Sequence, residues 1–196
     1  MLLRRRGRVT GYFPLEMTVL RQGLLSARAV ALAGGPSRAV IDALSGVGAR
    51  LLSLDETLDE DRAREWAAAT APIHALVYDA GPTFATGGQS ALREATERAW
   101  IATRAVGAGA LIPAGAGKVV LIAPRPDRGP LAAAASAALE NLARTLSVEW
   151  ARYGVTAVAI APGSATREEE LAELVCFLVS PAGDYFDGCL FELGAA

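Results

Sequence analysis

Short apolar runs alternate along the chain with longer, alanine-rich stretches that have helical periodicity. Runs of this length are typical of buried strands, and strands that alternate with helices indicate a parallel α/β sheet. The strands are predicted at 29–33, 50–54, 73–77, 118–123, 155–160 and 189–193. The helices are predicted in a short stretch that ends near 46–48 and at 60–69, 90–108, 131–153 and 168–179. The pattern therefore predicts a doubly wound α/β domain.

The start of the chain does not fit this pattern. Residues 1–26 are predicted to form an N-terminal arm, followed by a single domain over 27–196. The arm begins with basic residues, as a signal peptide does, but Pro14 and Glu16 interrupt the apolar run that a signal peptide needs. Whether translation begins at Met1 or Met17 is left open. No stretch of the sequence reaches the roughly 18 uninterrupted apolar residues of a membrane span.

Composition narrows the class of protein without naming an activity. Of the 196 residues, 52% are hydrophobic and 20% are charged, as expected for a globular domain with a real core. The net charge of -2 gives no electrostatic reason to expect nucleic acid or an acidic membrane as partner. Cys176 and Cys189 do not make a disulfide framework and are interpreted as small core residues of a cytoplasmic protein. No metal site is expected.

Three segments together carry a family resemblance. The stretch 137–163 contains a helix, a Tyr-Gly turn, a strand and a Pro-Gly pair in that order. The stretch 170–188 adds a last helix and a Ser-Pro-x-x-x-Tyr-x-x-Gly turn, and 75–81 is a strand that ends in Ala-Gly. From about residue 27 onward the chain resembles the short-chain dehydrogenase/reductase family. The resemblance implies a Rossmann-like sheet and, for an active member, oxidoreduction with NAD(P).

The family's catalytic positions are filled here by residues that cannot perform its chemistry. In the family, a Tyr exchanges a proton with the substrate, and a Lys four residues later lowers the Tyr pKa and holds the nicotinamide ribose. The resemblance places the Tyr position at Ala132 and the Lys position at Ser136. It places the family's Ser at Pro124 and its Asn near Ala95. Alanine has no proton to give and serine carries no charge at neutral pH, so no catalytic residue is expected.

Three other side chains are weighed as replacements. Tyr153 ends a long predicted helix and is interpreted as a structural turn residue. His74 is the only histidine and begins a predicted strand, where a solvated or hydrogen-bonded residue is expected. Tyr78 follows the same strand and lies nearer the expected cleft, so a role in contacting a ligand is left open.

The dinucleotide site of the family is damaged as well. It needs three glycines between the first strand and its helix, for the tight turn, for close approach of the phosphates and for packing. Gly35 matches the first glycine, whereas Ala39 and Ile41 stand at the other two, unless these fall in a deletion of about one helical turn. Ile41 would clash with a phosphate, and Pro36 offers no N–H. The expected remnants of the site are Gly34, Gly35, Ser37, Arg38, Asp55 and Asp79.

Asp55 follows Gly35 by 20 residues, the spacing expected for a ribose-binding acid. Between the first strand and the strand at Ala75, however, the family has two further β-α units, and this chain has room for one. The run 54–59 also resembles the strand end of the later unit. The ribose-binding unit is therefore predicted to be deleted, and Asp55 is interpreted as a loop or cap acid.

The stretch after Gly163 is short where the family has a substrate lid. Four residues lead from Gly163 into the last predicted helix. Thr166 and Glu169 fit the spacing of a capping box at its start. The lid is therefore predicted to be missing, which leaves nothing obvious to exclude water from a reaction site.

Association with other subunits is the family property that this chain is expected to retain. Family members associate through the two long helices and the last helix and strand, here about 90–108, 131–153 and 168–193. Their prominent apolar residues, interpreted either as core or as interface, are Trp100, Leu142, Leu146 and Trp150.

The leading hypothesis is a non-catalytic subunit of a heteromeric dehydrogenase, similar to the dehydrogenase of the benzylsuccinate pathway. It would form a heterotetramer with an active relative that binds NAD(P) and acts on an acyl-CoA or hydroxyacyl substrate, while this chain binds no cofactor. One alternative is an oxidoreductase with relocated catalytic residues. Another is a homomeric ligand-binding module that uses a cleft around Tyr78, Asp79 and Arg125. Arg125 and Arg128 are interpreted either as an anion site, for example for a CoA phosphate, or as solvated loop residues.

Overall fold

A computed structural model describes residues 20–85 and 87–194 and contains a parallel sheet with the strand order β2-β1-β3-β4-β5-β6. Every neighbouring pair of strands is parallel. The strands are β1 (Ala29–Ala33), β2 (Arg50–Ser53), β3 (Ala75–Asp79), β4 (Gly117–Ile122), β5 (Val155–Pro162) and β6 (Leu190–Leu193). The predicted doubly wound, Rossmann-like fold is confirmed. A single strand, β2, lies along the chain between β1 and β3, as the shortened sequence predicted.

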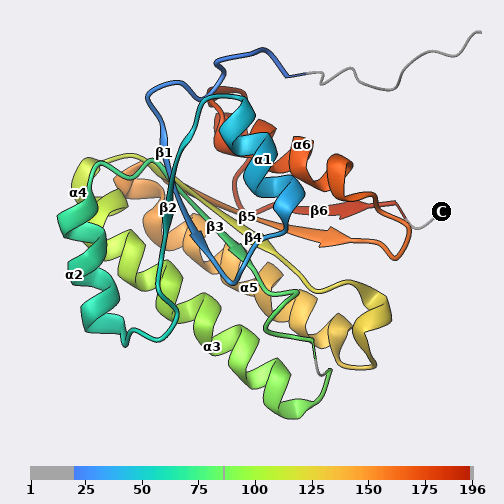
Figure 1. Ribbon diagram of the computed structural model, residues 1–196. Coiled ribbons are helices and arrows are strands. Elements are labelled where there is room, and N and C mark those ends of the chain that lie inside the picture. The colour runs from blue at the N-terminus through green and yellow to red at the C-terminus, as the bar shows by residue number, and fades with distance from the viewer. Residues whose placement is uncertain (1–19, 86, 195–196) are drawn as a thin grey trace, which may run out of the picture.

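Helices cover both faces of the sheet (Figure 1). On one face α1 (Arg38–Gly46) lies beside α6 (Glu168–Val179), and on the other lie α2 (Glu60–Thr70), α3 (Gln89–Val106) and α5 (Ala132–Trp150). From β1 the chain runs through α1 to β2, at the edge of the sheet. It then returns through α2 to β3, which lies on the other side of β1. Right-handed crossovers in opposite directions put these two helices on opposite faces. Their divergence creates a crevice at the carboxyl ends of β1 and β3.

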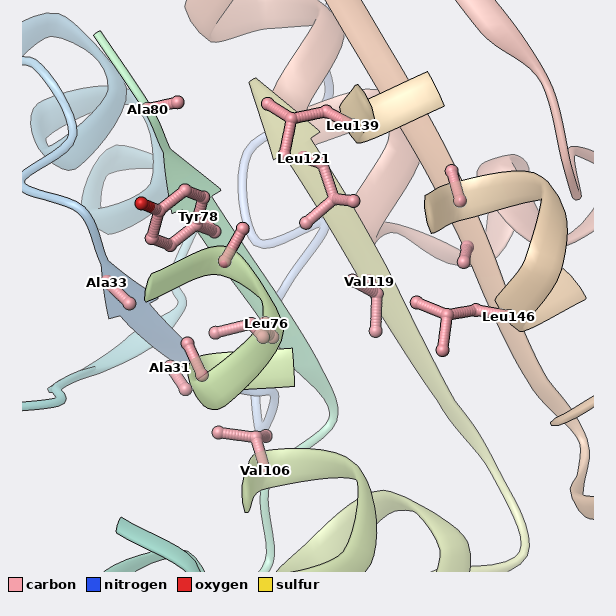
Figure 2. Close-up of a cluster of buried hydrophobic side chains, with 14 of the residues drawn as sticks. Ala31, Ala33, Leu76, Tyr78, Ala80, Val106, Val119, Leu121, Leu139 and Leu146 are labelled. Carbon is pink, nitrogen blue, oxygen red and sulfur yellow. The ribbon is translucent and has the colours of Figure 1, made fainter. Parts of the chain in front are cut away.

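The core forms two layers because successive strand residues point to opposite faces. In β3, Leu76 and Tyr78 pack toward α3 and α5, whereas Ala75 and Val77 pack toward α1 and α6. The strands β1, β4 and β5 alternate in the same way. Figure 2 shows Tyr78 inside the first layer, with Leu121 of β4 and Leu139 of α5 in the same cluster.

Helix α3 ends earlier than the predicted 90–108. It passes at Val106 into one π-helical turn, Gly107–Leu111, followed by α4 (Ile112–Ala114). The small residue at this junction lets α3 approach α5 closely, since a Cβ added to Gly107 would lie 2.3 Å from the Trp150 ring. The predicted end of the second long helix, 151–153, is a 3-10 turn (Ala151–Tyr153). Leu146 is buried, and Leu142 and Trp150 pack against the core, whereas Trp100 is exposed.

The helix starts follow capping chemistry. Ser37 caps α1 by accepting a hydrogen bond from the Val40 N–H, and the Asp59 carboxylate caps α2 in the same way. The predicted capping box of Thr166 and Glu169 is wrong. The box is formed one residue later, by Arg167 and Glu170, because the Thr166 hydroxyl instead accepts from the Gly163 N–H and donates to the Leu193 carbonyl.

Part of the predicted arm belongs to the folded domain. Residues 22–27 form turns, and Leu25 is fully buried in the layer beside α1 and α6. The two candidate start codons, Met1 and Met17, lie outside the described residues. Within 20–85 and 87–194, no helix is both long and apolar enough to cross a membrane.

Candidate functional site

A cleft of about 310 Å³ lies at the carboxyl ends of β1, β3, β4 and β5, on the side of the sheet that α1 and α6 cover. This is the crevice where doubly wound sheets hold ligands. Its charged and polar lining combines two carboxylates with two guanidinium groups and one hydroxyl: Asp79, Glu168, Arg125, Arg128 and Ser37. The cleft is therefore the candidate site, and its charges decide what it can hold.

The turn between β1 and α1 is built around close backbone packing. Gly34 has φ +78°, and a Cβ at this position would lie 2.0 Å from the Asp79 carbonyl oxygen. Gly35 has φ +76° and packs near the Pro82 ring. Gly34 is therefore required to join β1 to β3. This role is fulfilled without any ligand.

The other residues of the predicted dinucleotide turn have structural partners too. Arg38 forms an exposed ion pair with Asp42. Ala39 and Ile41 pack, partly buried, against the layer between α1 and α6. The Ile41 side chain thus lies in that layer and does not project toward a phosphate, which corrects the predicted clash.

Asp79 places a buried carboxylate at the N-terminus of α1. Its side chain accepts a hydrogen bond of 2.8 Å from the Gly81 N–H, and the residue is only 7% exposed. Burial raises the pKa of Asp79 to about 7, against the opposing effects of the Gly81 and Ser37 N–H groups and of Arg125. The position nearest the positive end of the α1 dipole is thus occupied by a carboxyl group of the protein itself.

Arg125 clamps the connection between β5 and α6. Its guanidinium donates to the carbonyls of Gly163 (2.9 Å) and Thr166 (2.6 Å) and forms an ion pair of 2.6 Å with Glu168. Burial raises the pKa of Glu168, but hydrogen bonds from Arg125 and Ser37 outweigh this effect and lower it. Arg125 is therefore not a solvated loop residue, and three of its donors are already bound within the protein. Arg128 lines the cleft from an exposed position.

Replacing Arg125 by methionine should lower the free energy of unfolding by about 2 kcal/mol, because two carbonyls and one carboxylate lose a shared charged donor. Urea unfolding at pH 7 measures this loss. Arg38→Met is the matched control. Its ion pair with Asp42 is exposed on both sides and should contribute less than about 0.5 kcal/mol. Equal effects of the two substitutions would contradict the clamp.

The four positions that the resemblance matches to catalytic residues carry no ionisable side chain. Ala132 is the buried first residue of α5, and Ser136 lies one turn later on the same helix. Pro124 is buried just after β4. Ala95 is buried on α3. At these positions the chain therefore offers no acid, base or charged side chain.

The side chains weighed as replacements lie elsewhere. Tyr78 is fully buried on the α3 side of the sheet, donates to the Ala95 carbonyl (2.9 Å), and has its pKa raised by burial. It does not face the cleft that Asp79 lines, because adjacent strand residues point to opposite faces. Figure 2 shows the Tyr78 side chain inside the buried cluster. The hypothesis of a shared site with Asp79 and Arg125 is thus wrong for Tyr78. Tyr153 stacks on Arg152 in the turn after α5, as a structural residue does.

Asp55 and the stretch after Gly163 lie as predicted. The Asp55 carboxylate is exposed and accepts hydrogen bonds from the N–H and hydroxyl of Thr57, so it stabilises its own loop. Residues 163–167 alone connect β5 to α6. Neither segment adds a group that covers the cleft.

These residues do not fit the pyrophosphate of a nicotinamide dinucleotide. Such a group needs free N–H donors and a positive field at the start of α1. Here the carboxyl groups of Asp79 and Glu168 face Ser37, the N-terminal cap of this helix. Pro36 removes a donor from the turn, and the Ser37 hydroxyl accepts from the Val40 N–H and donates to the Glu168 carboxylate.

Solved structures with the same fold include several dehydrogenases. A citronellol catabolism dehydrogenase of Pseudomonas aeruginosa PAO1 matches with TM-score 0.74 and 21% identity, over 91% of this chain and 98% of that chain. A hydroxysteroid dehydrogenase from Escherichia coli matches with TM-score 0.72 and 17% identity, over 89% and 98%. A short-chain dehydrogenase/reductase family oxidoreductase from Burkholderia thailandensis matches with TM-score 0.72 and 18% identity, over 84% and 90%.

At these identities the likeness shows a shared fold. No family model and no curated protein sequence matches the chain.

Proposed function

We propose that this chain is a short-chain dehydrogenase/reductase that has lost catalysis and serves as a supporting subunit of an active relative. The observation that carries the proposal is the start of α5, where buried Ala132 stands at the family's proton-donor position. A scaffold that keeps its sheet and helices without a proton donor retains assembly as its useful property. In the complex, NAD(P) and substrate bind to the partner.

The charge of the cleft supports the same proposal. Glu168, whose pKa is lowered, faces the start of α1, so a pyrophosphate placed there would meet like charge, to which Asp79 adds when it is ionised. Three of the five N–H donors of Arg125 are already bound to Gly163, Thr166 and Glu168, so this side chain is largely committed to contacts within the protein. Cofactor binding at this position would therefore bring the pyrophosphate beside the Glu168 carboxylate, which costs free energy unless the charge is offset.

The helices α3 and α5 offer the surface for the partner. They lie side by side on one face of the molecule (Figure 1) and present large exposed apolar residues, Trp100 (43%) and Val148 (80%). The exposed side of α5 also carries the small residues Ala133 and Ala137, which permit close helix–helix approach. One further exposed hydrophobic side chain is Tyr185 in η4 (Pro181–Tyr185), which is 91% exposed.

Co-expression with the intact short-chain dehydrogenases of the same genome tests the proposal. Tagged chain should retain one of them in equal amount, raise its turnover, and show no turnover alone. Val148→Glu should abolish retention without changing Tm, since the side chain is exposed. The matched control, Ala69→Glu on α2, adds the same charge at another exposed helix position and should retain the partner. Normal NAD(P)H turnover by the isolated chain would overturn the proposal.

A further inference from the structure

A second pocket, of about 290 Å³, lies at the opposite end of the strands from the cleft, at the amino ends of β1, β3, β4 and β5. Its lining includes Arg28, His74, Lys118, Thr156 and Asp184. The parallel register brings these residues together, since Val30 pairs with Ala75, Ala75 with Lys118, and Lys118 with Thr156. Three nitrogen-bearing side chains thus meet one carboxylate in a single pocket.

The charges of this pocket do not balance. Lys118 is buried and satisfied: its ammonium group donates to the Leu178 and Ser180 carbonyls and pairs with Asp184 at 2.5 Å. Arg28, by contrast, forms no ion pair within residues 20–85 and 87–194. Within the described residues no ion pair balances the charge of the Arg28 guanidinium, since Asp184 is paired with Lys118.

His74 presents a donor to the same pocket. Its Nδ1 accepts a 3.0 Å hydrogen bond from the Ala29 N–H, so in the neutral ring the proton is on Nε2. Arg50, whose guanidinium donates to the Pro72 carbonyl, adds a further cation beside it. Burial, Arg28 and Arg50 together lower the pKa of His74, which agrees with a positive field in this region.

We infer that this amino-edge pocket, lined by Arg28, His74 and Thr156, binds an oxyanion: phosphate or the phosphate group of a monoester. The guanidinium offers a planar pair of donors that matches a phosphate, and neutral His74 adds the Nε2–H. The Thr156 hydroxyl lies on the same sheet face as Lys118, with which it pairs in register. The pocket is at the opposite end of the strands from the cleft, so the inference does not depend on the proposed partner.

The only histidine of the chain makes a direct test possible, because the His74 ring gives one set of imidazole signals in an NMR spectrum. Inorganic phosphate is titrated into the full chain at ionic strength held constant with chloride. We expect a saturable shift of the His74 signals. We also expect a higher His74 pKa in saturating phosphate, because the bound anion offsets the positive charges nearby. These are the charges of Arg28 and Arg50, since that of Lys118 is already balanced by Asp184.

Arg28→Met should weaken phosphate binding about tenfold or more, since it removes the charged donor pair. Arg38→Met, which removes an exposed arginine at the other end of the strands, should leave the titration unchanged. Arg28→Lys keeps the charge without the planar geometry and should show intermediate affinity, which preserves the test if the methionine variant does not fold. An equal response to chloride, or wild-type titration in Arg28→Met, would overturn the inference.

Methyl phosphate in place of inorganic phosphate identifies the source of the anion. Tighter binding of the ester points to the end of a larger phosphorylated molecule, and tighter binding of the inorganic ion points to free phosphate. Absence of a His74 response to both probes rejects the site.

Discussion

Asp79→Asn should stabilise the protein at pH 8 by up to about 4 kcal/mol, the free energy that corresponds to the rise of the carboxyl pKa from 3.8 to about 7. The folded state holds the Asp79 proton more tightly than the unfolded chain does. Its contribution to stability is therefore complete below about pH 4 and is lost as the pH rises to about 7. Asparagine never ionises and keeps an oxygen that can accept from the Gly81 N–H.

Urea unfolding at pH 4, 6 and 8 measures this effect as the difference between variant and wild type. The difference should grow with pH up to about 7 and then level off. Asp127→Asn makes the same substitution at an exposed position beside the cleft and should change the free energy of unfolding by less than about 0.5 kcal/mol at each pH. An Asp79→Asn variant that is less stable than wild type at pH 8 would show that a charged Asp79 is needed for the fold.

Gly34→Ala should lower the free energy of unfolding by about 3 kcal/mol or more. The residue has φ +78°, which strains any L side chain, and its new Cβ would lie 2.0 Å from the Asp79 carbonyl oxygen. Neither atom can move without separating β1 from β3, since both belong to backbone at the carboxyl ends of paired strands. Chemical unfolding followed by circular dichroism gives the size of the loss.

Gly46→Ala is the matched control for that variant. Gly46 is the last residue of α1, and a Cβ there would have no atom within 4 Å. The substitution should be neutral or stabilise the chain by up to about 1 kcal/mol, because alanine favours the helix. If Gly34→Ala were tolerated as well as Gly46→Ala, close backbone packing of Gly34 against Asp79 would not be needed to join β1 to β3.

The hydrophobic pattern of the sequence was sufficient to predict the sheet but not the residues of the candidate cleft. The strand 29–33 and the helix 168–179 were predicted with the bounds that the structure has, because apolar residues mark both. The third strand was predicted two residues too early, at 73–77, and this hid the alternation that separates Tyr78 from Asp79. Tyr78 and Asp79 were predicted to line one cleft because both were taken to lie in the loop after the strand.

Contacts between distant residues could not be predicted. Arg125 binds carbonyls and a carboxylate about 40 residues later in the chain, and no local pattern shows those partners. The amino-edge pocket did leave a signal in the sequence. Arg28, His74 and Lys118 each stand at or just before the start of a strand, and parallel strands bring their starting residues to one edge.

Cofactor stoichiometry shows whether this chain supports an active relative without binding cofactor itself. The purified complex is titrated calorimetrically with NADH and, separately, with NADPH. We expect one bound cofactor for each pair of unlike chains, with no heat of binding for this chain alone. One cofactor for every chain in the complex would contradict the proposed function.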